Sequence, residues 1–373
     1  DADYNTALGA QALTTDTLGS RTTAIGFNAL KNQNFTTATN SYNVSVGYES
    51  GLTLTTGTLN TLVGGFAGYG LTTGVSNVIM GYATGDALTD ADYNVAIGAT
   101  ALTSDTKGSR SVAVGYGALT IQNFTTATDS YNTAIGYVAG NNITTGLYNI
   151  LIGGLAGDAL TDADYNVVLG YNALGADTQG SRSIAIGAET LKVQNFTTAQ
   201  NAHNIAIGHV AGNDITTGIE NILIGGLAGD ALTDADSNVA VGKSSLSADT
   251  LGSRSTALGY STLNAQNFTT ATNTYNVAVG YQAGQKITTG IVNTLIGALA
   301  GDALTASSSN TAVGYSALTT DTLGTASVAV GAYALQNQNF TTSLASNNVA
   351  VGYYAGKDVT TGRYNVFVGS NAG

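Results

Sequence analysis

The chain has 373 residues, only 9% of them charged, and a formal net charge of −12, with no proline and no cysteine. An acidic chain with 11 basic residues and no basic cluster is a poor match for nucleic acid or for an anionic membrane surface. It also lacks the run of about 18 apolar residues that a membrane-spanning helix requires.

A five-residue motif, here called the pentad, recurs twenty-one times along the chain. It reads Asn (or Ser or Thr), a β-branched residue, a third residue that is usually Ala or Leu, an aliphatic residue, and Gly. Successive pentads are 17 residues apart, except for five steps of 21. We predict a short strand at each pentad, in chain order 5–9, 22–26, 43–47, 60–64, 77–81, 94–98, 111–115, 132–136, 149–153, 166–170, 183–187, 204–208, 221–225, 238–242, 255–259, 276–280, 293–297, 310–314, 327–331, 348–352 and 365–369.

The spacing of the pentads predicts one continuous repeat array over 1–373. Steps of 17, 21, 17 and 17 make a 72-residue cycle, and one extra 17-residue unit lies near 60–76. A fixed period of this length is typical of stacked repeats, in which each unit contacts only its neighbours. We therefore expect an all-β parallel β-solenoid, or β-roll, of about 21 turns. At about 4.8 Å per turn it would form a rod of roughly 100 Å.

The first pentad residue is Asn in sixteen of the twenty-one copies. Two explanations remain open. Stacked amides can form a hydrogen-bonded ladder along the array, or Asn simply suits the turn that precedes the strand.

The third pentad residue suggests self-association. Residues two and four point to one face of a strand and residue three to the other. Because residue three is also apolar, both faces need a partner, and we expect one of them to meet another chain. The predicted contacts at the axis of a homotrimer, intertwined or side by side, are the alanines at this position together with Leu62, Leu151, Leu223, Leu295 and Phe367.

Several pentads resemble repeats of known fibrous proteins. The strings 111–115, 183–187 and 327–331 resemble the head repeats of trimeric autotransporter adhesins. The segments 132–140 and 143–146 are similar to repeats of bacteriophage tail fibres and large bacterial surface proteins. The resemblance implies a left-handed parallel β-roll with three chains around one axis, although the adhesin heads repeat at a shorter interval.

Acidic residues recur near the start of each 72-residue cycle. Carboxylates at such spacing can bind a hard cation such as Ca²⁺, and the alternative is that they are solvated turn residues. The weak metal candidates are Asp86, Asp90, Asp92, Asp158, Asp162 and Asp164. We predict no cofactor.

The five 21-residue steps share an inserted loop that contains Gln-Asn-Phe-Thr-Thr. Its phenylalanine either plugs the core under its own loop or is exposed to bind glycans or other partners. The candidate ligand-binding residues are Phe35, Phe124, Phe196, Phe268 and Phe340. The same loops carry an N-glycosylation pattern at Asn34, Asn123, Asn195, Asn267 and Asn339.

No enzymatic activity is expected, because no nucleophile, base and acid recur together and the two histidines, His203 and His209, occur in one cycle only. The leading hypothesis is the structural shaft of an extracellular fibre: a phage tail fibre, a surface adhesin or a filament. The alternative is a receptor- or glycan-binding adhesin head that uses the repeated loops, and an ice-binding solenoid is a third. The expected location is extracellular, on a cell surface or on a virion. Because both ends of the sequence fall in phase with the repeat, we expect a segment of a longer fibre or subunits that stack end to end into a filament.

Overall fold

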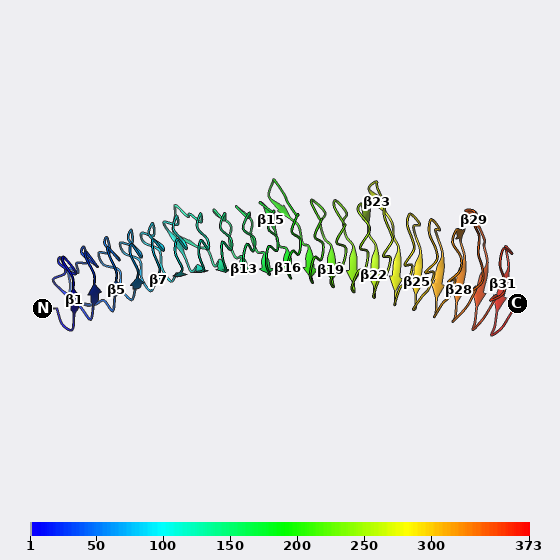
Figure 1. Cartoon of the computed structure of the whole chain (residues 1–373), viewed down its shortest axis with the longest axis horizontal. Helices are drawn as coiled ribbons and strands as arrows, with labels where there is room; N and C mark the ends of the chain where they lie inside the picture. Colours follow the sequence, from blue (N-terminus) through cyan, green and yellow to red (C-terminus); the bar gives the residue numbers. More distant parts are fainter. Residues whose placement is uncertain (1) are drawn as a thin grey trace. The chain divides into compact units, whose positions relative to one another are not determined.

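A computed structural model describes residues 2–373, within which all regular structure is β-strand. The chain divides into two compact units, Asp1–Ser183 with Asn195–Gln200, and Ile184–Gln194 with Asn201–Gly373. Each unit is a parallel β-solenoid in which every pentad provides one three-residue strand (Figure 1). The prediction of a single array across the boundary stays a prediction. None of the described residues forms a helix that could cross a membrane.

The strands of the first unit are β1 (Thr6–Leu8), β2 (Gly19–Ser20), β3 (Thr23–Ile25), β4 (Thr39–Asn40), β5 (Val44–Val46), β6 (Thr61–Val63), β7 (Val78–Met80), β8 (Val95–Ile97), β9 (Gly108–Ser109), β10 (Val112–Val114), β11 (Thr128–Asp129), β12 (Thr133–Ile135), β13 (Ile150–Ile152), β14 (Val167–Leu169) and β15 (Gly180–Ser181). One residue of β17 (Gln200–Asn201) belongs to each unit. Those of the second unit are β16 (Ile184–Ile186), β18 (Ile205–Ile207), β19 (Ile222–Ile224), β20 (Val239–Val241), β21 (Gly252–Ser253), β22 (Thr256–Leu258), β23 (Thr272–Asn273), β24 (Val277–Val279), β25 (Thr294–Ile296), β26 (Thr311–Val313), β27 (Gly324–Thr325), β28 (Val328–Val330), β29 (Leu344–Ala345), β30 (Val349–Val351) and β31 (Val366–Val368).

Equivalent residues of successive pentads pair in register. Within the first unit, for example, Ala134 of β12 lies opposite Leu151 of β13, which in turn lies opposite Val168 of β14. The extra unit near 60–76 forms an ordinary turn, because β6 pairs with β5 on one side and with β7 on the other. A whole added repeat therefore leaves the pairing pattern unchanged, as expected where each turn contacts only its neighbours.

The structure reverses the expected roles of the two strand faces. Residue three of the pentad points into the solenoid, and residues two and four point outward, so most strands are buried only at their centre. The predicted oligomer contacts Leu62, Leu151, Leu223 and Leu295 are fully buried inside their own chain, and Phe367 is half-buried. The prediction that these residues contact another chain was wrong, because the Ala or Leu at residue three fills the interior of its own solenoid.

Large and small residues compensate each other in this interior. Gly140, the fourth residue after a pentad glycine, has a φ of +58°, and a Cβ there would lie 2.6 Å from Cδ1 of Leu151 and 3.1 Å from Cδ2 of Leu119. In the preceding turn, Leu119 takes the place of Gly140 and the next pentad carries Ala134 in place of Leu151. Leucine at one position thus accompanies a small residue at the other, which keeps the core close-packed.

Two features connect each turn to the next. The pentad glycine allows a close backbone approach: Gly136 has a φ of +145°, and a Cβ there would lie 2.3 Å from the carbonyl oxygen of Gly153. The pentad asparagines form the predicted ladder. Asn132 Oδ1 accepts from the backbone N–H of Asn149 at 2.9 Å, and Asn149 Oδ1 accepts from that of Asn166 at 3.0 Å. The amide ladder is therefore confirmed.

Candidate functional site

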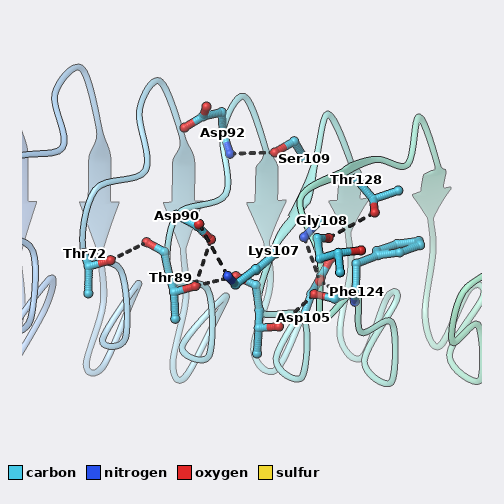
Figure 2. Close-up of polar contacts among 12 residues, drawn as sticks. Thr72, Thr89, Asp90, Asp92, Asp105, Lys107, Gly108, Ser109, Phe124 and Thr128 are labelled. Atoms are coloured by element: carbon cyan, nitrogen blue, oxygen red, sulfur yellow. Dashed lines mark hydrogen bonds and ion pairs between the residues drawn. The ribbon is translucent and has the colours of Figure 1, made fainter.

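The turn that precedes an inserted loop contains a buried carboxylate that anchors the loop. Oδ1 of Asp105 accepts hydrogen bonds from the backbone N–H groups of Gly108 and Phe124, each at 3.0 Å (Figure 2). Oδ2 accepts from Gln122 Nε2 at 2.6 Å. Burial raises the pKa of Asp105, and the hydrogen bonds oppose that rise. Three hydrogen-bond donors therefore hold this carboxylate in the core.

Gln122 links this carboxylate to the asparagine ladder. Its Nε2 also donates to Ser111 Oγ at 2.9 Å, and its Oε1 accepts from Asn132 Nδ2 at 2.9 Å. A second hydroxyl contact joins Ser111 to Ser130 at 2.6 Å. We call this set, Asp105, Gln122, Ser111, Ser130 and Asn132, the polar hub. The equivalent Asp–Gln bonds, at 2.5–2.6 Å, are Asp16–Gln33, Asp249–Gln266 and Asp321–Gln338.

The phenylalanines of the inserted loops lie under their own loops. Their exposed fractions run from 3% for Phe340 to 7% for Phe196. The same is true of the rest of the set, Phe35, Phe124 and Phe268. Their rings have no free face for a ligand. The ligand-binding assignment was therefore wrong, and the alternative of a core plug is confirmed.

The predicted glycosylation residues lie at the surface. Asn34, Asn123, Asn195 and Asn267 are exposed, and Asn339 is half-buried. Each Oδ1 accepts from a threonine hydroxyl of the preceding turn, at distances of 3.1 to 3.3 Å. Their accessibility is compatible with modification, which stays a prediction.

The structure does not bring the candidate metal ligands together. Asp90 forms an ion pair with Lys107 at 3.7 Å, and Asp92 accepts from the backbone N–H of Val75 at 2.7 Å. In the next cycle, Asp162 accepts from a threonine hydroxyl and Asp164 from a backbone N–H. Among residues 2–373 no cluster of three potential ligands occurs. These acidic residues bond within the turns instead.

The first aspartate of both candidate groups, and its equivalent Asp230 in the following 72-residue cycle, differ from the other acidic residues. Oδ1 of Asp86, Asp158 and Asp230 is buried and has no hydrogen-bond partner. Burial raises the pKa of each of these carboxyl groups above the ordinary aspartate value. The ionised form is therefore disfavoured in the folded chain, and these are stability-sensitive positions rather than ligands.

The remaining candidates for chemistry are dispersed. His203 and His209 flank opposite ends of β18, and both are exposed. A cavity of about 320 Å³ is lined by Tyr354, Lys357, Asp358, Asn371 and Gly373. The Lys357 ammonium in it lies 4.6 Å from the centre of the Tyr354 ring, so the lysine already has a cation–π partner. The expectation from the sequence that the chain has no enzymatic activity therefore stays a prediction.

Sequence reasoning missed the aromatic columns. In the first unit, Tyr131, Tyr148 and Tyr165 occupy the same place in three successive turns, and their rings stack. The guanidinium groups of Arg110 and Arg182 lie over the outer rings of this run. The stack could have been predicted from the sequence, because tyrosine recurs directly before the pentad at intervals of 17 residues.

Comparison with protein-family models, with characterised proteins and with solved structures finds no match to this chain.

Proposed function

We propose that this chain is a structural repeat shaft of an extracellular fibre, located on a cell surface or a virion. The observation that carries the proposal is the repetition of the same connections at each turn: parallel strand pairing, the amide ladder and the close glycine approach. The turns within each unit differ mainly in core volume and in the inserted loops. At about 4.8 Å per turn, ten or eleven turns extend roughly 50 Å along a unit.

The outward strand face supports self-association. Aliphatic side chains at pentad residues two and four remain partly exposed, for example 42% for Ile150 and 43% for Leu169. Residue four is apolar at every turn and residue two at most turns, so together they form an apolar stripe. Large exposed apolar surfaces are typical of interaction sites. We propose a parallel homotrimer, as the resemblance to trimeric adhesins implies, whose contact face consists of residues two and four rather than residue three.

The alternative functions have less support. An adhesin that uses the inserted loops would have to bind through threonines and asparagines, because the loop phenylalanines are buried. An ice-binding surface needs free threonine hydroxyls. Here Thr144 donates to the carbonyl oxygen of Thr161 at 3.2 Å, and Thr161 to that of Thr178 at 3.0 Å.

Sedimentation equilibrium of the wild type and of two double variants tests the assembly. Ile150→Asp with Leu169→Asp places charges on the outward stripe, where burial of unpaired charge would cost several kcal/mol. Thr125→Asp with Thr126→Asp adds the same charge to an exposed loop as a matched control. We expect trimers for the wild type and the control and monomers for the stripe variant. A monomeric wild type would overturn the assembly, and compact rather than elongated particles in electron micrographs would overturn the shaft.

A further inference from the structure

Three tyrosines of the first unit form a stack that the strand register imposes. The ring centres of Tyr131 and Tyr148 are 5.5 Å apart with planes inclined by 10°, and those of Tyr148 and Tyr165 are 5.0 Å apart with planes inclined by 3°. The exposed fraction of each residue lies between 42% and 48%. The phenols are thus parallel, adjacent and open to small reagents from one side.

Backbone and guanidinium contacts hold these rings in place. The N–H of Tyr148 donates to the carbonyl oxygen of Ser130 at 2.9 Å, and that of Tyr165 donates to Leu147 at 3.0 Å. The Arg182 guanidinium lies 5.0 Å from the ring centre of Tyr165. Cation–π contacts and offset stacking both favour this ordered arrangement.

We propose that Tyr148 and Tyr165, with Tyr131 next to them, are a site of oxidative cross-linking, at which a peroxidase and hydrogen peroxide join successive turns by a dityrosine bond. Each phenol loses one electron and one proton to give a tyrosyl radical. The two radicals form a carbon–carbon bond between ring positions ortho to the hydroxyls, and the ortho hydrogens then return to the oxygens. Hydrogen peroxide accepts the two electrons and two protons and becomes two water molecules.

The register favours coupling within one chain. The ring centres of adjacent turns lie only 5.0–5.5 Å apart, so the two half-exposed rings can bond through their ortho carbons once they rotate out of the parallel stack. Holding two reacting groups side by side removes the entropy cost of an encounter between molecules. The chain has no cysteine, so disulfides cannot connect its turns. Phenol coupling would supply a covalent link instead.

Two other tyrosine pairs have the same arrangement. In the first unit, Tyr116 and Tyr137 are 5.6 Å apart at 13°. In the second, Tyr260 and Tyr281 are 5.5 Å apart at 10°. The proposal depends on stacking within one chain and not on the fibre function.

The experiment is peroxidase oxidation of the full chain at low protein concentration, read by dityrosine fluorescence and by peptide mass after cleavage before aspartate. Asp158, Asp162 and Asp164 separate Tyr148 from Tyr165 in the sequence, so the cross-link joins two otherwise separate peptides with the loss of two hydrogens. We expect this linked species in the wild type.

Tyr148→Phe keeps the ring and the stack but removes the phenol, so both cross-links of the column should disappear. Tyr171→Phe is the matched control, because Gly154 and Ala188 occupy the equivalent places in the preceding and following repeats of the sequence. This variant should keep both cross-links. Three results would each overturn the proposal: oxidised tyrosines without the linked peptide, linkage only between chains with a yield that rises with concentration, or an equal yield from the urea-unfolded chain.

Discussion

Replacement of the hub aspartate tests whether buried polar bonds, rather than the loop phenylalanine alone, hold the inserted loop. Asp105→Ala removes the acceptor of three donors: the N–H groups of Gly108 and Phe124, and Gln122 Nε2. Each buried donor left without a partner costs about 1–3 kcal/mol. Relief from burying a carboxylate offsets part of that sum, so we expect a net loss of roughly 3–5 kcal/mol, as for other broken buried polar sites.

Asp105→Asn should have an intermediate effect. It retains one acceptor oxygen and directs an amide N–H₂ toward one of the former donors. One lost bond and one unfavourable contact correspond to about 1–3 kcal/mol. Asp90→Ala is the control in the same unit, since the exposed Asp90–Lys107 pair at 3.7 Å should contribute less than about 1 kcal/mol.

Amide hydrogen exchange is the appropriate measurement, because a long repeat need not unfold in one step. In Asp105→Ala the amides of Gly108 and Phe124 should exchange about 10²–10⁴-fold faster, since 1.4 kcal/mol corresponds to a factor of ten. Amides on the far turns should change little. Equal effects of Asp105→Ala and Asp90→Ala would refute the reasoning.

Three further predictions concern the core, the ladder and pH. Gly140→Ala should destabilise its turn by about 1–3 kcal/mol through overpacking. Adding Leu151→Ala should cost less than the sum of the single changes in a double-mutant cycle read by amide exchange, because the two sites share space. Asn149→Ala leaves Asn166 N–H and the Ala163 carbonyl unpaired, and amide exchange in the adjacent turns should show a loss of about 2–4 kcal/mol. Because burial raises the pKa of Asp158, stability falls as pH rises above the ordinary aspartate pKa. Asp158→Asn should therefore raise the melting temperature at neutral pH and leave it unchanged in acid; an equal gain at both would contradict this origin.

The period of the sequence was sufficient to predict the strands and their parallel pairing. A β-branched residue, an aliphatic residue and a glycine corner at a constant interval fit one strand per turn, and few other arrangements pair such short strands. The amide ladder was among the explanations that the sequence left open. These features depend on local geometry and on contacts between neighbouring turns.

The inner and outer faces could not be assigned by alternation alone, because both are apolar. The deciding signal was a pairing of sizes: where the third pentad residue is Leu151, the position in contact with it is Gly140, and where it is Ala134, that position is Leu119. Such compensation indicates contact inside one chain. The sequence also contained a signal for the burial of Phe124. Asp105 and Gln122 lie seven residues after a pentad glycine, the position that the buried Ile143 and Leu160 occupy in other turns, so polar core residues accompany the inserted loop.

The polar hub explains why the long step always follows a pentad that begins with Ser or Thr. A buried aspartate needs donors, and the loop inserted in the next turn provides them through the Phe124 N–H and Gln122. Gln122 in turn needs an acceptor between the two turns, and Ser111 in place of Asn provides it. Loss of any one of the three changes would leave a buried polar group without a partner, so the aspartate, the serine and the four-residue insertion have to occur together. A plain 17-residue turn carries no such requirement, which is why one could be added near 60–76 without disturbing any hub.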